Sequence, residues 1–280
     1  MQKKYAFAIG LAFLAAVLIY LLADTVAEKP VASSEPSPAA AEPGTFDVHQ
    51  YLKSLGDTLT PAEKRDSAAL FARVLSEGKD APAIREAVFF FTRLEKPIAV
   101  AYAAFRQAES ENTRQSWEDA ADIQSYLMAT APDEAIRHFL GENAIKGYEK
   151  ATEMAPDESS IRIKLAASYI DDGRNPMQGI TVLRDVLAKD SLNIDALMMM
   201  GKFSMMSNQL DKALLRFEKV LSLQPSNPEA LLGMAQVWEN RGNTEEASRY
   251  LERCLNTDID PMLRENIRKH LGELKNQRKN

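Results

Sequence analysis

The stretch that decides the fold is MGKFSMMSNQLDKALLRFEKVLSLQP, residues 200–225. Residues 165–191 and 234–259 align with it, so that side chains of the same kind fall at the same places. The matching sets are Leu165, Met200 and Met234; Tyr169, Ser204 and Trp238; Gly173, Asn208 and Gly242; Gly179, Ala213 and Ala247; Leu183, Phe217 and Leu251; Val186, Val220 and Cys254. The spacing is 34 residues, with one extra residue in the internal turn of the first copy. A period of this length is typical of a solenoid of helical hairpins.

Each copy is predicted to fold as two amphipathic helices joined by a short turn. The small residues Gly179, Ala213 and Ala247 are expected where the two helices of a copy cross most closely. Because one copy cannot bury its apolar face alone, the copies must stack on one another. The sequence therefore predicts an all-α, right-handed helical-hairpin solenoid, preceded by a single N-terminal transmembrane helix.

Residues 200–225 resemble the tetratricopeptide repeat (TPR) family, in which a Leu-Gly pair, an Ala, an aromatic residue and a closing Pro recur every 34 residues. The corresponding positions here are Met200, Gly201, Ala213, Phe217 and Pro225. The neighbouring copies depart from this pattern at four places: Arg162 at the usual Trp, Gly179 for Ala, Cys254 at a usually small position, and Ile259 for Pro.

The repeat register and the changes in composition together divide the chain into nine segments. They are a cytoplasmic N-terminus (1–4), a transmembrane signal anchor (5–23), a disordered Pro/Ala/Glu linker (24–45), diverged helical pairs (46–112), a degenerate TPR-like repeat (113–157), three TPRs (158–192, 193–226 and 227–260) and a C-terminal capping helix (261–275).

Residues 5–23 are almost wholly apolar and uncharged. A helix of this length approaches the ~30 Å thickness of a bilayer core. Lys3 and Lys4 precede it, which predicts a cytoplasmic N-terminus and an exported C-terminal domain. We therefore expect a single-pass protein of the bacterial inner membrane with a periplasmic domain. The alternative is a cleaved signal peptide ending near Thr25-Val26-Ala27.

The linker is rich in Pro, Ala, Ser and Glu and has too little apolar surface to fold by itself. We expect it to act as a tether, and a Pro-rich docking motif is the alternative. Further along, Thr60-Pro61-Ala62-Glu63 predicts a helix start with a capping box.

Three consecutive phenylalanines, Phe89, Phe90 and Phe91, lie in a predicted helix over residues 82–95. Their side chains spread over more than half of the helix circumference, so one apolar stripe cannot hold all three. A helix sandwiched inside the solenoid is the first interpretation. An exposed partner or dimer surface is the second.

Composition and motifs argue against several classes of function. The formal charge of −6 lacks the basic excess of a nucleic-acid binder, so we expect no nucleic-acid partner. The single Cys254 excludes an intramolecular disulfide and a cysteine-based metal cluster. The three histidines have no metal-ligand spacing, and no phosphate loop or nucleophile elbow is present. We expect no enzyme activity, no catalytic residue, no metal and no cofactor.

In TPR proteins the first helix of each copy lines a concave groove, and the resemblance implies which residues face it here. They are Ser160, Ile163, Ala167 and Ile170; Asp195, Met198, Lys202, Met205 and Met206; and Glu229, Leu232, Gln236, Glu239 and Asn240. The middle copy is rich in Met, which suits a surface that adapts to apolar partners. Alternatively, Met198, Met205 and Met206 are ordinary packing residues.

These observations predict a non-catalytic, membrane-tethered scaffold that binds a protein partner of unknown identity in the groove. Its layout resembles bacterial single-span TPR proteins that attend the secretion translocon or envelope assembly. A self-associating structural subunit of a larger inner-membrane complex, formed through residues 89–91 or the groove, is the alternative.

Overall fold

The computed structural model describes residues 46–55, 57, 59–74, 80–131 and 133–277. The predicted anchor and linker, residues 1–45, lie outside this part of the chain. Its regular structure is helical, with no strand in the described ranges. The helices are α2 (Val48–Leu55), α3 (Pro61–Val74), α4 (Ala81–Arg93), α5 (Pro97–Glu111), α6 (Arg114–Met128), α7 (Glu134–Met154), α8 (Ser159–Asp172), α9 (Pro176–Lys189), α10 (Ile194–Met206), α11 (Leu210–Leu223), α12 (Pro228–Asn240), α13 (Thr244–Leu255) and α14 (Pro261–Gln277). None of these helices combines the length and apolar character needed to cross a membrane.

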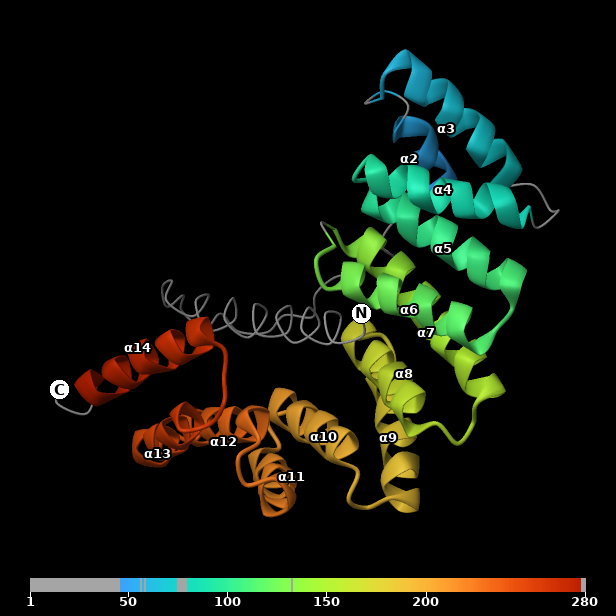
Figure 1. Ribbon diagram of the computed structural model, residues 1–280. Coiled ribbons are helices and arrows are strands. Elements are labelled where there is room, and N and C mark those ends of the chain that lie inside the picture. Colours follow the sequence, from blue (N-terminus) through green and yellow to red (C-terminus); the bar gives the residue numbers. More distant parts are fainter. Residues whose placement is uncertain (1–45, 56, 58, 75–79, 132, 278–280) are drawn as a thin grey trace, which may run out of the picture.

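Successive helices pack as antiparallel pairs that stack into an arch (Figure 1). The most extensive contacts between helices are those within the pairs α6–α7, α8–α9, α10–α11 and α12–α13. The second helix of each pair also packs against the first helix of the next pair. The first helices α8, α10 and α12 follow the inner edge of the arch, and α9 and α11 lie on its outer side (Figure 1). The described chain is therefore an all-α, TPR-like solenoid, as predicted.

Small residues allow the helices of a pair to approach closely. Ala213 and Ala247 have no exposed surface, and Gly179 is buried at the equivalent position. The Phe217 ring lies against two more glycines: a Cβ atom added at Gly201 would be 2.6 Å from it, and one added at Gly233 would be 2.7 Å from it. Phe217 therefore packs α11 against both α10 and α12.

The turns within the pairs share a backbone conformation. Gly173, Asn208 and Gly242 have φ values of 78°, 55° and 73°. A left-handed φ favours Gly or Asn, which explains why these residue types recur at this position. Helix starts recur too: Asn193 and Asn227, 34 residues apart, accept hydrogen bonds from Ala196 N (3.0 Å) and Ala230 N (2.9 Å).

The N-terminal helices form without a visible sequence repeat. The predicted capping box is present, since Thr60 N donates to Glu63 Oε2 (2.9 Å) and Glu63 N donates to Thr60 Oγ1 (3.3 Å). The predicted exposed surface of three phenylalanines is corrected, because Phe90 and Phe91 are 7% and 0% exposed whereas Phe89 is 73% exposed. Phe91 stacks on Phe71 of α3, so α4 is indeed packed on more than one side.

The solenoid ends in α14, which covers the last pair. Ile267, Leu271 and Leu274 are buried in the same apolar cluster as Leu251 of α13. Glu265, Arg268 and Lys269 are exposed on the other side. An amphipathic last helix keeps the apolar end of the stack away from water.

Candidate protein-binding surface

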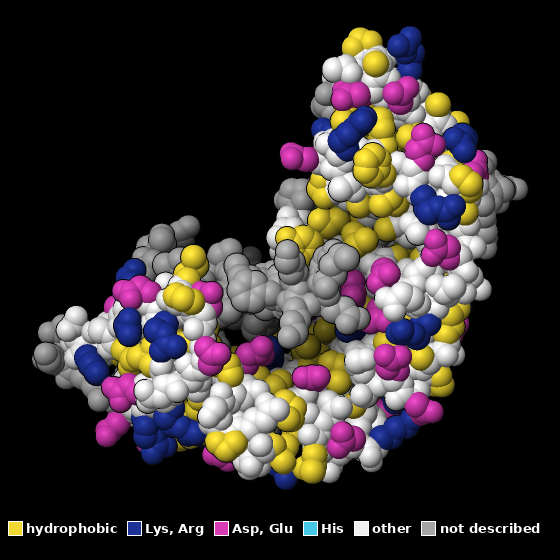
Figure 2. Space-filling model, in the orientation of Figure 1, with side chains coloured by type: hydrophobic (Ala, Val, Ile, Leu, Met, Phe, Trp, Pro, Cys, Tyr) yellow, Lys and Arg dark blue, Asp and Glu magenta, His cyan; other side chains and the backbone are white. Residues whose placement is uncertain are grey.

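The inner faces of α8, α10 and α12 form one continuous surface, which we call the inner groove. Helix α8 lies against α10, and α10 lies against α12. This surface lies on the concave side of the arch (Figure 1). Several Asp and Glu side chains lie along the inner edge (Figure 2). All fourteen residues predicted to face the groove lie on these three helices.

The structure separates the fourteen predicted groove residues by exposure. Four of them are exposed polar residues, namely Ser160, Asp195, Glu229 and Asn240. Ile163, Ile170 and Met198 are buried and pack in the core. Met206 is 71% exposed. The half-buried residues are Ala167, Lys202, Met205, Leu232, Gln236 and Glu239. Three of the predicted side chains thus stabilise the stack, and the other eleven retain accessible surface.

The accessible apolar part of the inner groove comes from α10 and α12. Met205 and Leu232 pack against the core cluster with part of their surface free, and Met206 is mostly exposed. Flexible Met side chains can follow the shape of an apolar partner. These three residues, Met205, Met206 and Leu232, form what we call the Met strip.

Ion pairs flank the Met strip. Lys202 Nζ of α10 is 3.2 Å from Glu229 Oε2 of α12. His270 Nε2 of α14 is 2.9 Å from Glu239 Oε2, and Glu273 approaches the other ring nitrogen at 3.6 Å. The hydrogen bond with Glu239 raises the pKa of His270 above its ordinary value, although burial opposes the shift.

The groove extends onto α6, which the sequence prediction missed. Lys164 Nζ of α8 is 2.9 Å from Glu118 Oε1 and 2.9 Å from both carboxylate oxygens of Asp122. Burial works to lower the pKa of Lys164, but these hydrogen bonds leave it raised. Tyr148 of α7 also donates to Asp122 (2.6 Å). Aligning Trp117 with Leu197 of the second repeat would have identified both residues. In that alignment Glu118 corresponds to Met198, and Asp122 corresponds to Lys202.

Acids outnumber bases at the inner positions. Asp171 and Asp195 are exposed, and they join the carboxylates of Glu118, Asp122, Glu229 and Glu239. Two lysines, Lys164 and Lys202, oppose these six acids. In the part of the chain that the structure describes, no three His, Cys, Asp or Glu side chains come together as a metal site requires.

Comparison with known proteins finds a family match for one part of the solenoid. Residues 204–261 match the tetratricopeptide repeat family model. The search of curated proteins found no match.

Solved structures of similar overall form include MamA from Desulfovibrio magneticus RS-1 (14% identity, TM-score 0.47, covering 65% of this chain and 96% of that one). YrrB, described as a TPR protein with an unusual peptide-binding site, has 15% identity and a TM-score of 0.43 (72% and 98% covered). PilW, described as a widely conserved type IV pilus biogenesis factor, has 14% identity and a TM-score of 0.45 (75% and 93% covered). The family match covers residues 204–261, and this segment is similar to tetratricopeptide repeats.

Proposed function

We propose that the protein is a non-catalytic, membrane-tethered interaction scaffold of the bacterial envelope, acting in secretion or envelope protein assembly. The observation that carries this proposal is the Met strip, an accessible apolar surface inside an acidic inner groove. The expected partner is a protein segment with apolar side chains next to Lys or Arg. Apolar contact would supply most of the affinity, and the charges would orient the segment and speed association.

Affinity capture with matched variants tests the groove. Met206 (71% exposed) lies on the inner groove, and Leu215 of α11 (66% exposed) is an equally exposed apolar residue of the same repeat outside it. The full chain, Met206→Asp and Leu215→Asp are captured from membranes in mild detergent. We expect Met206→Asp to lose a partner that Leu215→Asp retains. High salt should weaken the capture of this partner by the unsubstituted chain. Identical partners for all three proteins would refute binding through the Met strip.

The anchor and its orientation are a separate part of the proposal. They rest on the apolar run 5–23 and the two lysines before it. We expect the chain in the membrane fraction after carbonate extraction, and its C-terminal domain digested by protease only after the outer membrane is opened. Recovery of a shortened chain in the soluble fraction would instead indicate cleavage near residue 27.

Self-association is the second candidate function, and the exposure of Phe89 favours it. Phe89 lies at a shallow cleft of about 390 Å³ between α3 and α4, lined also by Arg73, Glu86 and Arg93. An exposed aromatic ring beside arginines is typical of interface hot spots. Light scattering of the full chain in detergent, compared with Phe89→Asp, tests this candidate. A dimer lost on that substitution would support it, and an unchanged mass would reject it.

A further inference from the structure

The contact between α7 and α8 differs from the next two contacts between neighbouring helical pairs. Leu187 with Leu197, and Leu221 with Leu231, belong to the apolar cluster that joins successive pairs. The positions equivalent to these leucines at the contact between α7 and α8 hold Thr152 and Arg162. Two polar residues thus replace the leucine pair that is present at the next two contacts.

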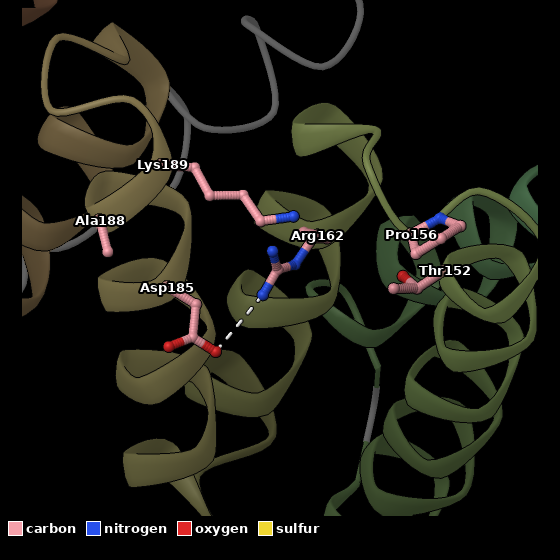
Figure 3. A pocket seen from close by; sticks show the side chains of 6 residues that line it. All are labelled: Thr152, Pro156, Arg162, Asp185, Ala188 and Lys189. Atoms are coloured by element: carbon pink, nitrogen blue, oxygen red, sulfur yellow. Dashed lines mark hydrogen bonds and ion pairs between the residues drawn. The ribbon is translucent and has the colours of Figure 1, made fainter.

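A cleft of about 570 Å³ lies where the leucine pair is replaced. Its lining residues are Thr152, Pro156, Arg162, Asp185, Ala188 and Lys189. The charged ends of Arg162 and Lys189 lie together, between Asp185 on one side and Thr152 and Pro156 on the other (Figure 3). The volume falls within the range of ligand sites, and small apolar side chains complete the lining.

The polar groups of this cleft have unused hydrogen-bonding capacity. The Arg162 side chain is only 15% exposed. It has five N–H donors, and in the described structure one of them contacts an acceptor, with Nη2 3.4 Å from Asp185 Oδ2. Lys189 pairs with Asp157 at 3.0 Å, but both side chains are largely exposed. The buried Thr152 Oγ1 has no hydrogen-bond partner in the described structure. The donors of Arg162, Lys189 and Thr152 together favour a carboxylate as the ligand. A phosphate is less suitable, because the nearby Asp185 and Asp157 would repel its double negative charge.

We propose that the cleft binds the chain's own acidic linker, with the carboxylate of Glu35 on Arg162 and the adjoining Pro36 against Pro156 and Ala188. The linker carries its acids beside proline, as in Glu35-Pro36 and Glu42-Pro43. Proline-rich segments lose little conformational freedom on binding and fit shallow apolar surfaces. The acidic, proline-rich segment therefore matches both the charge and the lining of the cleft.

Chain geometry selects Glu35 over Glu42. The Phe46 ring, at the end of the linker, packs 5.1 Å from the Phe139 ring of α7. From Phe139 to Thr152 the helix rises about 20 Å. Four residues back from Phe46, Glu42 reaches only about 12 Å, whereas Glu35, eleven residues back, reaches about 34 Å in an extended conformation.

Tethering also decides between this occupant and a free peptide. The cleft is shallow and water reaches its ion pairs, so its intrinsic affinity is low. A short linker raises the local concentration of its own segment to the order of millimolar, which a weak site needs for occupancy. If the proposed anchor holds, a linker bound at residue 35 leaves only residues 24–34 free and keeps α7–α9 close to the membrane.

Photo-crosslinking in the full, detergent-solubilised chain tests the proposal. A photoreactive residue replaces Ser37, and the crosslinked sites are mapped by mass spectrometry. We expect crosslinks concentrated in residues 152–189. Both Arg162→Leu and Glu35→Gln should reduce them by up to about fivefold, as the loss of one water-accessible ion pair implies.

Two matched controls accompany these variants. Arg184→Leu makes the same charge change on α9 outside the cleft, and Glu42→Gln makes the same change in the linker out of reach. Neither should reduce the crosslinks. Because Arg162→Leu restores the residue found in the next two copies, and Glu35→Gln lies outside the solenoid, both variants should fold. Crosslinks spread over the surface, crosslinks to another protein, or equal effects of Glu35→Gln and Glu42→Gln would overturn the proposal.

Discussion

Gly179 shows how closely the two helices of a pair approach. A Cβ atom at this position would overlap the carbonyl oxygen of Ala166 and would lie 2.9 Å from Ile170 Cγ1. The equivalent Ala213 and Ala247 are accommodated without exposure, so this pair is closer than its neighbours. The backbone oxygen of α8 cannot move without shifting the helix.

We therefore expect Gly179→Ala to lower the free energy of unfolding by about 1–3 kcal/mol, as overpacking typically does. The matched control is Gly272→Ala on α14, where an added Cβ meets no atom within 4 Å. The higher helix propensity of Ala should raise stability there by up to about 1 kcal/mol. Urea unfolding followed by circular dichroism measures both. An increase in stability for Gly179→Ala would show that the helices are not in close contact.

His270 makes the end of the inner groove sensitive to pH. Its pKa is raised in the folded protein, above the value of about 6.5 expected for the unfolded chain. The stabilisation is fully present below about pH 6.5 and is lost as pH rises through the folded pKa. Because both side chains are partly exposed, the contribution should be at most about 1 kcal/mol.

We expect His270→Gln to be less stable than the wild type at pH 6 and to approach it at alkaline pH. His49→Gln is the control, since His49 packs edge-on against Tyr102 and forms no ion pair in the described structure. Thermal melts from pH 5.5 to 9 provide the comparison. A stability difference that grows as pH rises would contradict the expected sign.

At the scale of helices, the contact between α7 and α8 differs in side-chain chemistry from the next two equivalent contacts. Thr152 Oγ1 is buried there without a hydrogen-bond partner, and the equivalent residues are leucines. Thr152→Val keeps the shape and removes the unsatisfied hydroxyl, so we expect stability to rise by about 1 kcal/mol. The control is Thr181→Val, which removes a hydroxyl that donates to Met177 O (3.0 Å) and should bring no gain. Denaturant unfolding measures the free energy of unfolding of both variants. A loss of stability in Thr152→Val would mean that the hydroxyl has a hydrogen-bond partner.

The helices themselves could largely be predicted from the sequence, because periodicity and end signals are local. The 34-residue register located the pairs from α8 to α13, and Thr60 with Glu63 located the start of α3. The N-terminal pairs lack the repeat, so the sequence predicted that they are helical but did not predict how they pack. The packing of Phe90 and Phe91 depends on contacts with α3 and α5.

Contacts between distant residues could not be predicted in the same way. Glu239 and His270 are 31 residues apart and meet because α14 folds back onto the last pair. The cleft at Arg162 exists because Thr152 faces it from the preceding pair. Met198 is buried although its register position faces the groove, since exposure depends on how far each helix turns toward its neighbour.

At the scale of the whole molecule, the stack forms an arch (Figure 1), and acidic side chains lie along its inner edge (Figure 2). The Met strip belongs to the inner helices α10 and α12. The account depends on a protein segment binding there. A solenoid whose pairs contact only their neighbours has a large concave surface for this purpose and needs no closed pocket.

The most direct test places a photoreactive residue at position 206, on the Met strip, and in a second protein at position 215, on the outer side of the same repeat. Both proteins are crosslinked in cells, and the products are identified by mass spectrometry. We predict that position 206 alone forms a crosslink to a distinct protein, at a segment with apolar and basic residues. Identical products at both positions, or only lipid at position 206, would contradict a protein-binding groove.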